Sequence, residues 1–244
     1  MGQKSLELNP NILPNEKENF WQGVKDCVPT LLGYLSIGFA AGVVEKTAGL
    51  SIMEIALMSL LLYAGSGQFI AAGMIAASNP ISAIIFTVLF INLRHLLLSA
   101  ALAPYFQHLS PWKNMIVGSL LTDETFGVAI NHAQGKKQVN YRWMLGLNIA
   151  AYLNWILANI AGGFLGQWIS NPERFGLDFA LPGMFIGLLV LQILSQKKYF
   201  VDIMVALSAV LIVIAVSFFS FGSAGIMLAT ILASTIGMVV ERWR

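Results

Sequence analysis

Three short polar groups interrupt otherwise apolar stretches in the first half of the chain. They occupy residues 65–68 (Gly-Ser-Gly-Gln), 92–95 (Asn-Leu-Arg-His) and 122–124 (Thr-Asp-Glu). A charged side chain at the centre of a bilayer costs about 2.5–3.5 kcal/mol on insertion scales, so charges at such depths mark functional sites by default. A cation, two carboxylates and two glycines are therefore the residues with which this chain could build a site for a charged solute.

The first group predicts a broken helix. Gly65 and Gly67 each weaken a helix by roughly 1 kcal/mol, and an unwound stretch is tolerated in a membrane only where protein or water satisfies its backbone. We expect the N–H groups of Gly67, Gln68 and Phe69 to be free to bind a carboxylate, with hydrogen bonds added by Ser66 and Gln68. The alternative is a continuous helix whose glycines serve packing.

The second group contains Arg94, the only arginine or lysine that lies away from the ends of a predicted span. Its guanidinium cannot lose its proton in a protein, so it requires a carboxylate or a hydrated cavity. We expect Arg94 and Asn92 to contact substrate, unless Arg94 pairs with a carboxylate only to fix packing. His95 is a candidate proton carrier because histidine titrates near neutral pH, and the alternative is a hydrogen-bonding neighbour.

The third group supplies two carboxylates, Asp123 and Glu124. Adjacent side chains point about 100° apart on a helix, so we expect one to pair with Arg94 while the other lines the transport path. Two carboxylates and one guanidinium leave one negative charge, which suits an ammonium group, a cation or a transported proton. Asp123, Glu124 and His95 are accordingly the candidates for proton coupling.

A later stripe could form a cavity wall. Tyr152 and Trp155, with Asn148 and Asn159, follow spacings of three and four and so share one helix face. The same face could instead pack against neighbouring helices through hydrogen bonds. No metal site and no cofactor is predicted, because the chain has a single cysteine and shows no cluster of ligating residues.

The composition sets the fold class that must position these residues. Hydrophobic residues make up 57% of the chain and charged residues 11%, against about 25% charged in soluble domains. Uncharged runs exceed the ~20 residues that span a bilayer, which predicts an all-α polytopic membrane protein. About eight transmembrane helices are expected, and the second is expected to be discontinuous. If some segments are re-entrant, six or seven full crossings remain. The predicted spans cover residues 27–44, 52–77, 80–104, 110–131, 142–169, 179–194, 201–219 and 224–240.

Two local patterns refine these helices. Ser51 to Glu54 forms a capping-box pattern at the start of the second span, so we interpret Glu54 as a structural cap. Glycine pairs spaced four residues apart predict close helix contacts; they are Gly38 with Gly42, Gly162 with Gly166, and Gly183 with Gly187.

Loop charges predict the orientation. With eight crossings, Lys46, Lys113 and Arg174 lie on one side, and all other lysines and arginines outside the spans lie on the side of the two termini. Basic residues gather on the cytoplasmic side, so both termini are predicted to be cytoplasmic. We therefore expect residues 1–20 to form a polar cytoplasmic tail without a cleavable signal peptide, and residues 21–244 to form a single transmembrane transport domain.

The same polar groups carry a family resemblance. The residues 63–69 (Tyr-Ala-Gly-Ser-Gly-Gln-Phe), 92–95, 122–126 (Thr-Asp-Glu-Thr-Phe) and 176–182 (Gly-Leu-Asp-Phe-Ala-Leu-Pro) resemble the AzlC family in order and spacing. The likeness extends from about residue 20 to the end. AzlC proteins are the large subunits of two-component branched-chain amino acid exporters of the bacterial cytoplasmic (inner) membrane.

The resemblance implies export of leucine, isoleucine, valine and sometimes methionine, and a small hydrophobic AzlD-like subunit as partner. It adds no binding residues to those argued above. A secondary transporter is thus the leading hypothesis. A channel for a small polar solute or ion is the alternative, and an intramembrane enzyme is a third class that the chain supports poorly. Coupled, saturable and stereoselective flux separates a transporter from a channel.

Overall fold

The computed structural model describes residues 18–169 and 199–217 continuously, together with single positions between 174 and 190 and between 232 and 236. The chain divides into two compact units, residues 1–181 and 182–244, which we describe separately. Every regular element in the described residues is a helix. The all-α prediction is therefore confirmed.

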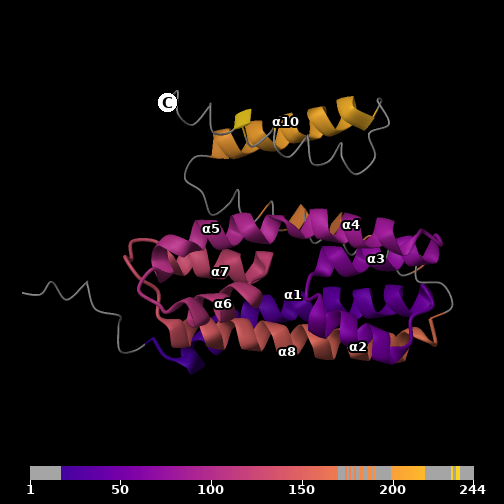
Figure 1. Cartoon of the computed structure of the whole chain (residues 1–244), viewed down its shortest axis with the longest axis horizontal. Coiled ribbons are helices and arrows are strands. Elements are labelled where there is room, and N and C mark those ends of the chain that lie inside the picture. Colours follow the sequence, from indigo (N-terminus) through magenta and orange to yellow (C-terminus); the bar gives the residue numbers. More distant parts are fainter. Residues whose placement is uncertain are drawn as a thin grey trace, which may run out of the picture. The chain divides into compact units, whose positions relative to one another are not determined.

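The first unit holds eight helices in its described part (Figure 1). They are α1 (Phe20–Thr47), α2 (Ile52–Leu61), α3 (Gly65–Ala76), α4 (Ile81–Asn92), α5 (Arg94–Phe106), α6 (Pro111–Ser119), α7 (Asp123–Ala133) and α8 (Tyr141–Gly166).

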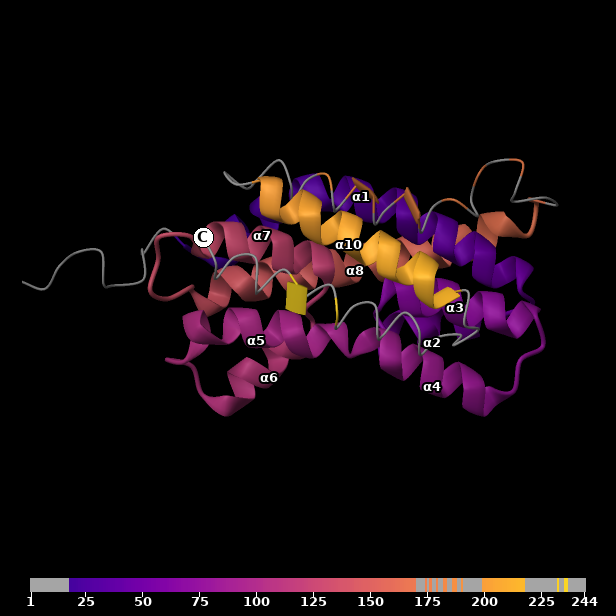
Figure 2. The same ribbon diagram turned by 90° about the horizontal axis from the view of Figure 1, so that it is seen from above.

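Two long helices, α1 and α8, lie side by side along their whole length (Figures 1 and 2). A Cβ added at Gly42 of α1 would lie 2.0 Å from the carbonyl oxygen of Asn159, and one at Gly162 of α8 would lie 2.1 Å from that of Phe39. The backbones approach this closely only because no side chain intervenes. The predicted close contacts at Gly42 and Gly162 are thus confirmed, whereas an added Cβ at Gly187 in the second unit would meet nothing within 4 Å.

The second predicted span is a helical hairpin that returns to the end of the unit where it started. Helix α2 begins beside the last turns of α8, because an added Cβ at Gly163 would lie 2.9 Å from Ile55. The chain breaks at residues 62–64, where Tyr63 has a φ of 42°, and α3 then runs back (Figure 1). The Ser51–Glu54 capping box is formed as predicted.

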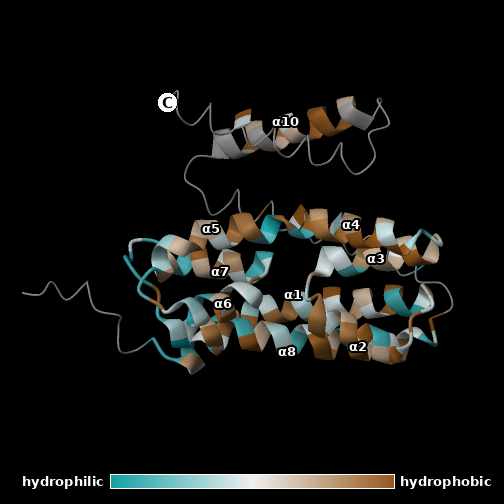
Figure 3. Ribbon diagram, in the orientation of Figure 1, coloured by the Kyte–Doolittle hydropathy of each residue, from teal (hydrophilic) through white to brown (hydrophobic). Residues whose placement is uncertain are grey.

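The third predicted span is almost continuous. Helices α4 and α5 are separated by Leu93 alone, which keeps a helical conformation. Together they make an apolar stretch, Ile81–Phe106, long enough to cross a membrane. Figure 3 shows hydrophilic residues at this junction within an otherwise hydrophobic stretch.

The fourth predicted span is a second hairpin, and the prediction of one continuous helix over residues 110–131 is wrong. The chain leaves helical geometry at residues 120–122. Lys113 at the start of α6 lies 5.2 Å from the ring of Tyr141, and His132 near the end of α7 stacks on Trp143 at 3.8 Å. Both arms of the hairpin therefore open at the N-terminal end of α8.

Within residues 18–169, three segments are long and apolar enough to cross a membrane: α1, the pair α4–α5, and α8. The hairpins α2–α3 and α6–α7 enter from opposite ends of the unit and meet near its middle (Figure 1). The loop assignment of Lys113 changes with this topology, because Lys113 lies at the end of the unit where α1 begins. The loop over residues 77–80 changes sides as well, but it holds no lysine or arginine, so the sides predicted for the other basic residues of the first unit are unchanged.

The second unit is described mainly by α10 (Tyr199–Ser217). This apolar helix coincides with the predicted span over residues 201–219. The predicted spans over residues 179–194 and 224–240 lie largely outside the described residues, and so does most of the 176–182 motif.

Candidate functional site

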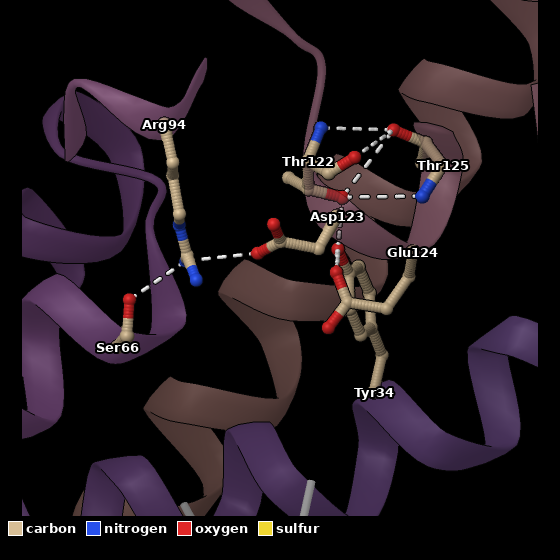
Figure 4. A network of polar contacts seen from close by, with 7 residues as sticks. All are labelled: Tyr34, Ser66, Arg94, Thr122, Asp123, Glu124 and Thr125. Carbon is tan, nitrogen blue, oxygen red and sulfur yellow. Dashed lines mark hydrogen bonds and ion pairs between the residues drawn. The ribbon is translucent and has the colours of Figure 1, made fainter. Parts of the chain in front are cut away.

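Arg94 lies where the two hairpins meet. It is the first residue of α5, and its Nη2 lies 2.8 Å from Asp123 Oδ2 and 2.7 Å from Ser66 Oγ, to which it donates (Figure 4). The Arg94 and Asp123 side chains are 23% and 20% exposed. The pair is thus partly open, and it links three broken segments through one guanidinium nitrogen.

The start of α7 is closed by reciprocal hydrogen bonds. Thr122 is the N-cap; its hydroxyl accepts from the N–H of Thr125, and the Thr125 hydroxyl accepts from the N–H of Thr122 at 2.9 Å. Asp123 and Glu124 occupy the first turn, where the partial positive charge of the helix terminus stabilises carboxylates. This local chemistry explains why the chain starts a new helix here.

The two adjacent carboxylates have different partners, and one of them pairs with Arg94, as the sequence led us to expect. Asp123 pairs with Arg94, whereas Glu124 Oε2 accepts a 2.7 Å hydrogen bond from the hydroxyl of Tyr34 on α1. Tyr34 also hydrogen-bonds the hydroxyl of Thr122. Glu124 is therefore held toward α1, and Asp123 toward α5.

The start of α3 has no such cap. Its N-cap, Ala64, offers no side-chain acceptor, so the first-turn N–H groups of Gly65, Ser66 and Gly67 have no capping partner from it. The predicted break is present, but the predicted set of free donors is wrong at Gln68, whose N–H bonds the Ala64 carbonyl at 2.9 Å. The reason is that the non-helical residues precede the glycines, which form the first turn of α3 instead.

The glycines at this turn allow close approach of other groups. A Cβ at Gly65 would lie 3.0 Å from the ring of Trp155, and one at Gly67 would lie 3.3 Å from the amide of Asn92. Asn92 thus borders the start of α3. His95, next to Arg94, is half-buried, and its Nε2 makes no hydrogen bond to any described residue.

The structure places the remaining predicted site residues in supporting positions. Gln68 is fully buried and accepts a 2.8 Å hydrogen bond from Trp155 Nε1. The Tyr152 hydroxyl donates to the Leu60 carbonyl at 2.7 Å, and so holds α8 against the end of α2. The stripe on α8 contacts its neighbours through hydrogen bonds, since Asn148 also donates to the Val117 carbonyl.

Sequence reasoning missed three features of this region. Tyr34 carried no signal of its own, because an isolated tyrosine in an apolar helix is ordinary. The break before Asp123 did carry one: a threonine followed by two acidic residues is a typical helix start. Glu45 was also overlooked, because the first span was expected to end at residue 44, whereas α1 continues to Thr47.

Taken together, the site combines a cation and an uncapped helix start with two carboxylates at a capped helix start. Such broken helices meeting at the centre of a multi-pass membrane protein are typical of secondary transporters. The chain belongs to the AzlC family: it matches the AzlC protein family over residues 29–169, which includes every residue of the site. It is a multi-pass membrane protein, since three segments within residues 18–169 are long and apolar enough to cross a membrane.

Three relatives illustrate the likeness. The chain is 28% identical to "Inner membrane protein YgaZ" of Escherichia coli, over 70% of this chain and 72% of the relative. It is 31% identical to an uncharacterized membrane protein of Archaeoglobus fulgidus, over 70% and 74%. It is 27% identical to "Branched-chain amino acid transport protein AzlC" of Bacillus subtilis, over 81% and 80%. No solved structure is detectably similar to the chain.

Proposed function

We propose that this chain is the large subunit of a secondary transporter that exports branched-chain amino acids. The observation that carries the proposal is the position of Arg94 between Ser66 at the start of α3 and Asp123 at the start of α7. The name of the Bacillus subtilis relative, a branched-chain amino acid transport protein, suggests the substrate class.

A zwitterion fits this arrangement through an exchange of partners. The substrate carboxylate replaces Asp123 on Arg94 and receives the N–H groups at the start of α3. Asp123, released from Arg94, then accepts the substrate ammonium. One ion pair becomes two, so no charge is left without a counter-charge while the substrate is bound.

The apolar side chain of the substrate requires a dry wall beside these charges. The ring of Trp155 borders Gly65, and Tyr34 packs edge-on against it with centroids 5.2 Å apart. These aromatic faces offer leucine, isoleucine or valine a contact that a polar amino acid could not use. Methionine, whose side chain is longer than that of leucine but similar in volume and flexible, suits the same wall.

The hairpin topology supports alternating access. Hairpins α2–α3 and α6–α7 open toward opposite ends of the unit, and Arg94 bridges their inner turns. Movement of either hairpin would expose the same guanidinium to one end. The cytoplasmic location of the N-terminus, which stays a prediction from loop charges, makes the end of the unit where α1 begins the loading side.

A small hydrophobic AzlD-like subunit completes the proposal. The stretch Ile81–Phe106 has no buried residue in its most apolar window, and large side chains along α4 such as Ile81 and Ile85 are more than half exposed. Such a face suits lipid or a second apolar chain. The family resemblance is what favours a partner subunit.

The decisive experiment is counterflow of labelled leucine in proteoliposomes that contain the full chain, with and without a co-expressed AzlD-like subunit. Saturable, stereoselective uptake driven by internal leucine is expected. Leucinamide, which lacks the carboxylate, should compete poorly. Linear, non-stereoselective flux would instead identify a channel and overturn the proposal.

A further inference from the structure

A second polar cluster lies fully buried between α1, α2, α3 and α8, apart from the Arg94 site. Its centre is Gln68, whose Nε2 lies 2.9 Å from Glu45 Oε1, 3.2 Å from Ser59 Oγ and 3.3 Å from Asn159 Oδ1. All four side chains are 0% exposed. The second carboxyl oxygen of Glu45, Oε2, is buried and has no hydrogen-bond partner among the described residues.

No described cation compensates Glu45. Its neighbour Lys46 is directed to the Leu50 carbonyl. Glu54, the only titratable residue of α2, is exposed and bonded to Ser51. Helix α3 contains no titratable residue. On α8 the titratable residue closest in sequence to Asn159 is Tyr152, whose hydroxyl donates a hydrogen bond to the Leu60 carbonyl of α2. A bare carboxylate so enclosed would be very costly, whereas a neutral acid is tolerated.

We propose that Glu45 is a proton-binding site that couples proton movement to transport, and this proposal rests on the function proposed above. In the conformation described here, Glu45 carries the proton. Its release leaves the carboxylate and passes the proton to water; its uptake reverses this. A proton fits better than a metal cation because the oxygens of Glu45, Ser59 and Asn159 surround the Gln68 amide nitrogen. That nitrogen occupies the position that a coordinated cation would need.

Gln68 provides the switch. Trp155 Nε1 can only donate, so its 2.8 Å contact fixes Gln68 Oε1 as the acceptor and directs the Nε2 hydrogens toward the other three residues. Two hydrogens then serve three acceptors. When Glu45 becomes negative it competes more strongly for these hydrogens, because charged acceptors form the stronger bonds. Ser59 or Asn159 then loses its hydrogen bond from Gln68 Nε2.

The switch is connected directly to the substrate site. Gln68 follows Ser66 by two residues in the first turns of α3, and Ser66 accepts from Arg94. Trp155, which Gln68 holds, packs on Gly65 in the same turn. A change at Gln68 therefore shifts the helix start that we propose receives the substrate carboxylate.

The position of Glu45 also gives the direction of access. It lies in the last turn of α1, two residues before the helix ends. A proton entering from that end of the unit crosses only this turn. With the predicted orientation this end faces away from the cytoplasm, so protons would move inward as amino acids move outward.

Infrared difference spectroscopy tests the proton directly, without transport. The full chain in detergent is titrated from neutral to alkaline pH, as wild type, Glu45→Gln and Glu54→Gln. We expect the carbonyl band of a protonated carboxylic acid in wild type and Glu54→Gln, and its loss or marked decrease in Glu45→Gln, which can still accept from Gln68 and should fold. An unchanged band in Glu45→Gln would overturn the proposal.

Proteoliposomes test the coupling. For one proton per leucine, a pH difference of one unit should sustain a leucine ratio of about tenfold. Glu45→Gln should keep leucine exchange without a gradient but lose this ratio, while Glu54→Gln behaves as wild type. If wild-type leucine exchange is intact but does not depend on the pH difference, or depends on a sodium gradient, the Glu45 proposal is refuted and the proposed transport function is not. Absence of leucine exchange in wild type would refute the proposed function instead, and the infrared result would still decide whether Glu45 binds a proton.

Discussion

The two hairpins have the same architecture and opposite chemistry. In each, about ten residues run inward, three non-helical residues turn the chain, and a second helix runs back. At the start of α3 the chain places small neutral residues and no cap, so free N–H groups favour an anion. At the start of α7 a threonine pair satisfies the cap and two carboxylates favour a cation. In the transporter proposed above, this difference would orient a zwitterion between the hairpins.

The largest effect is expected where both hairpins are contacted at once. Arg94→Lys shortens the side chain and replaces the guanidinium, whose Nη2 contacts both Ser66 and Asp123, with an ammonium group. We expect insertion to be normal and leucine counterflow to fall at least tenfold. Arg142→Lys, at the start of α8, is the control. Near-normal flux of Arg94→Lys at equal expression would show that any cation suffices.

Removing the negative charge of Asp123 on α7 should distinguish recognition of the substrate ammonium from recognition of its carboxylate. Asp123→Asn should weaken leucine transport by about tenfold, because one ion pair to the ammonium is lost. The same variant should bind 4-methylpentanoate, which has the carboxylate without the ammonium, as well as wild type or better. Inhibition constants measured in the counterflow assay check this. Equal losses for both compounds would mean that Asp123 acts only through Arg94.

Adding a side chain at α3 tests the anion end of the comparison. Gly65→Leu and Gly67→Leu should abolish counterflow, since the added groups meet Trp155 and Asn92 and cover the free N–H groups. Gly127→Leu on α7 is the control, because an added Cβ there meets nothing within 4 Å. Normal transport by both α3 variants would show that the backbone N–H groups at the start of α3 do not bind the substrate carboxylate.

The smallest effect is expected at the α7 cap. Thr125→Ala removes one half of the reciprocal cap and should lower stability by about 1 kcal/mol, with a modest loss of flux. Ser119→Ala, an exposed hydroxyl at the end of α6, should change neither property. Thermal denaturation in detergent compares the two variants. A loss at Thr125 as large as that at Arg94 would indicate that the cap itself contacts substrate.

The sequence alone located the charged centre for reasons that are local to the chain. Arg94 stood out because it is the only basic residue away from the ends of a predicted span, and the glycines around Ser66 because they weaken a helix at mid-span. A charge at that depth is costly, and a weakened helix needs compensating contacts, so both features were informative without any structure. The class of protein followed from composition by the same reasoning.

Tertiary structure decided where the chain turns and which groups meet. Whether Thr122 starts a new helix depends on what receives the freed backbone groups, and its hydroxyl is held by Tyr34, 88 residues away in sequence. Gln68 appeared to be a substrate ligand, yet α1, α2 and α8 enclose it together with Glu45. Pairings over such separations depend on helix packing, and no local pattern encodes them.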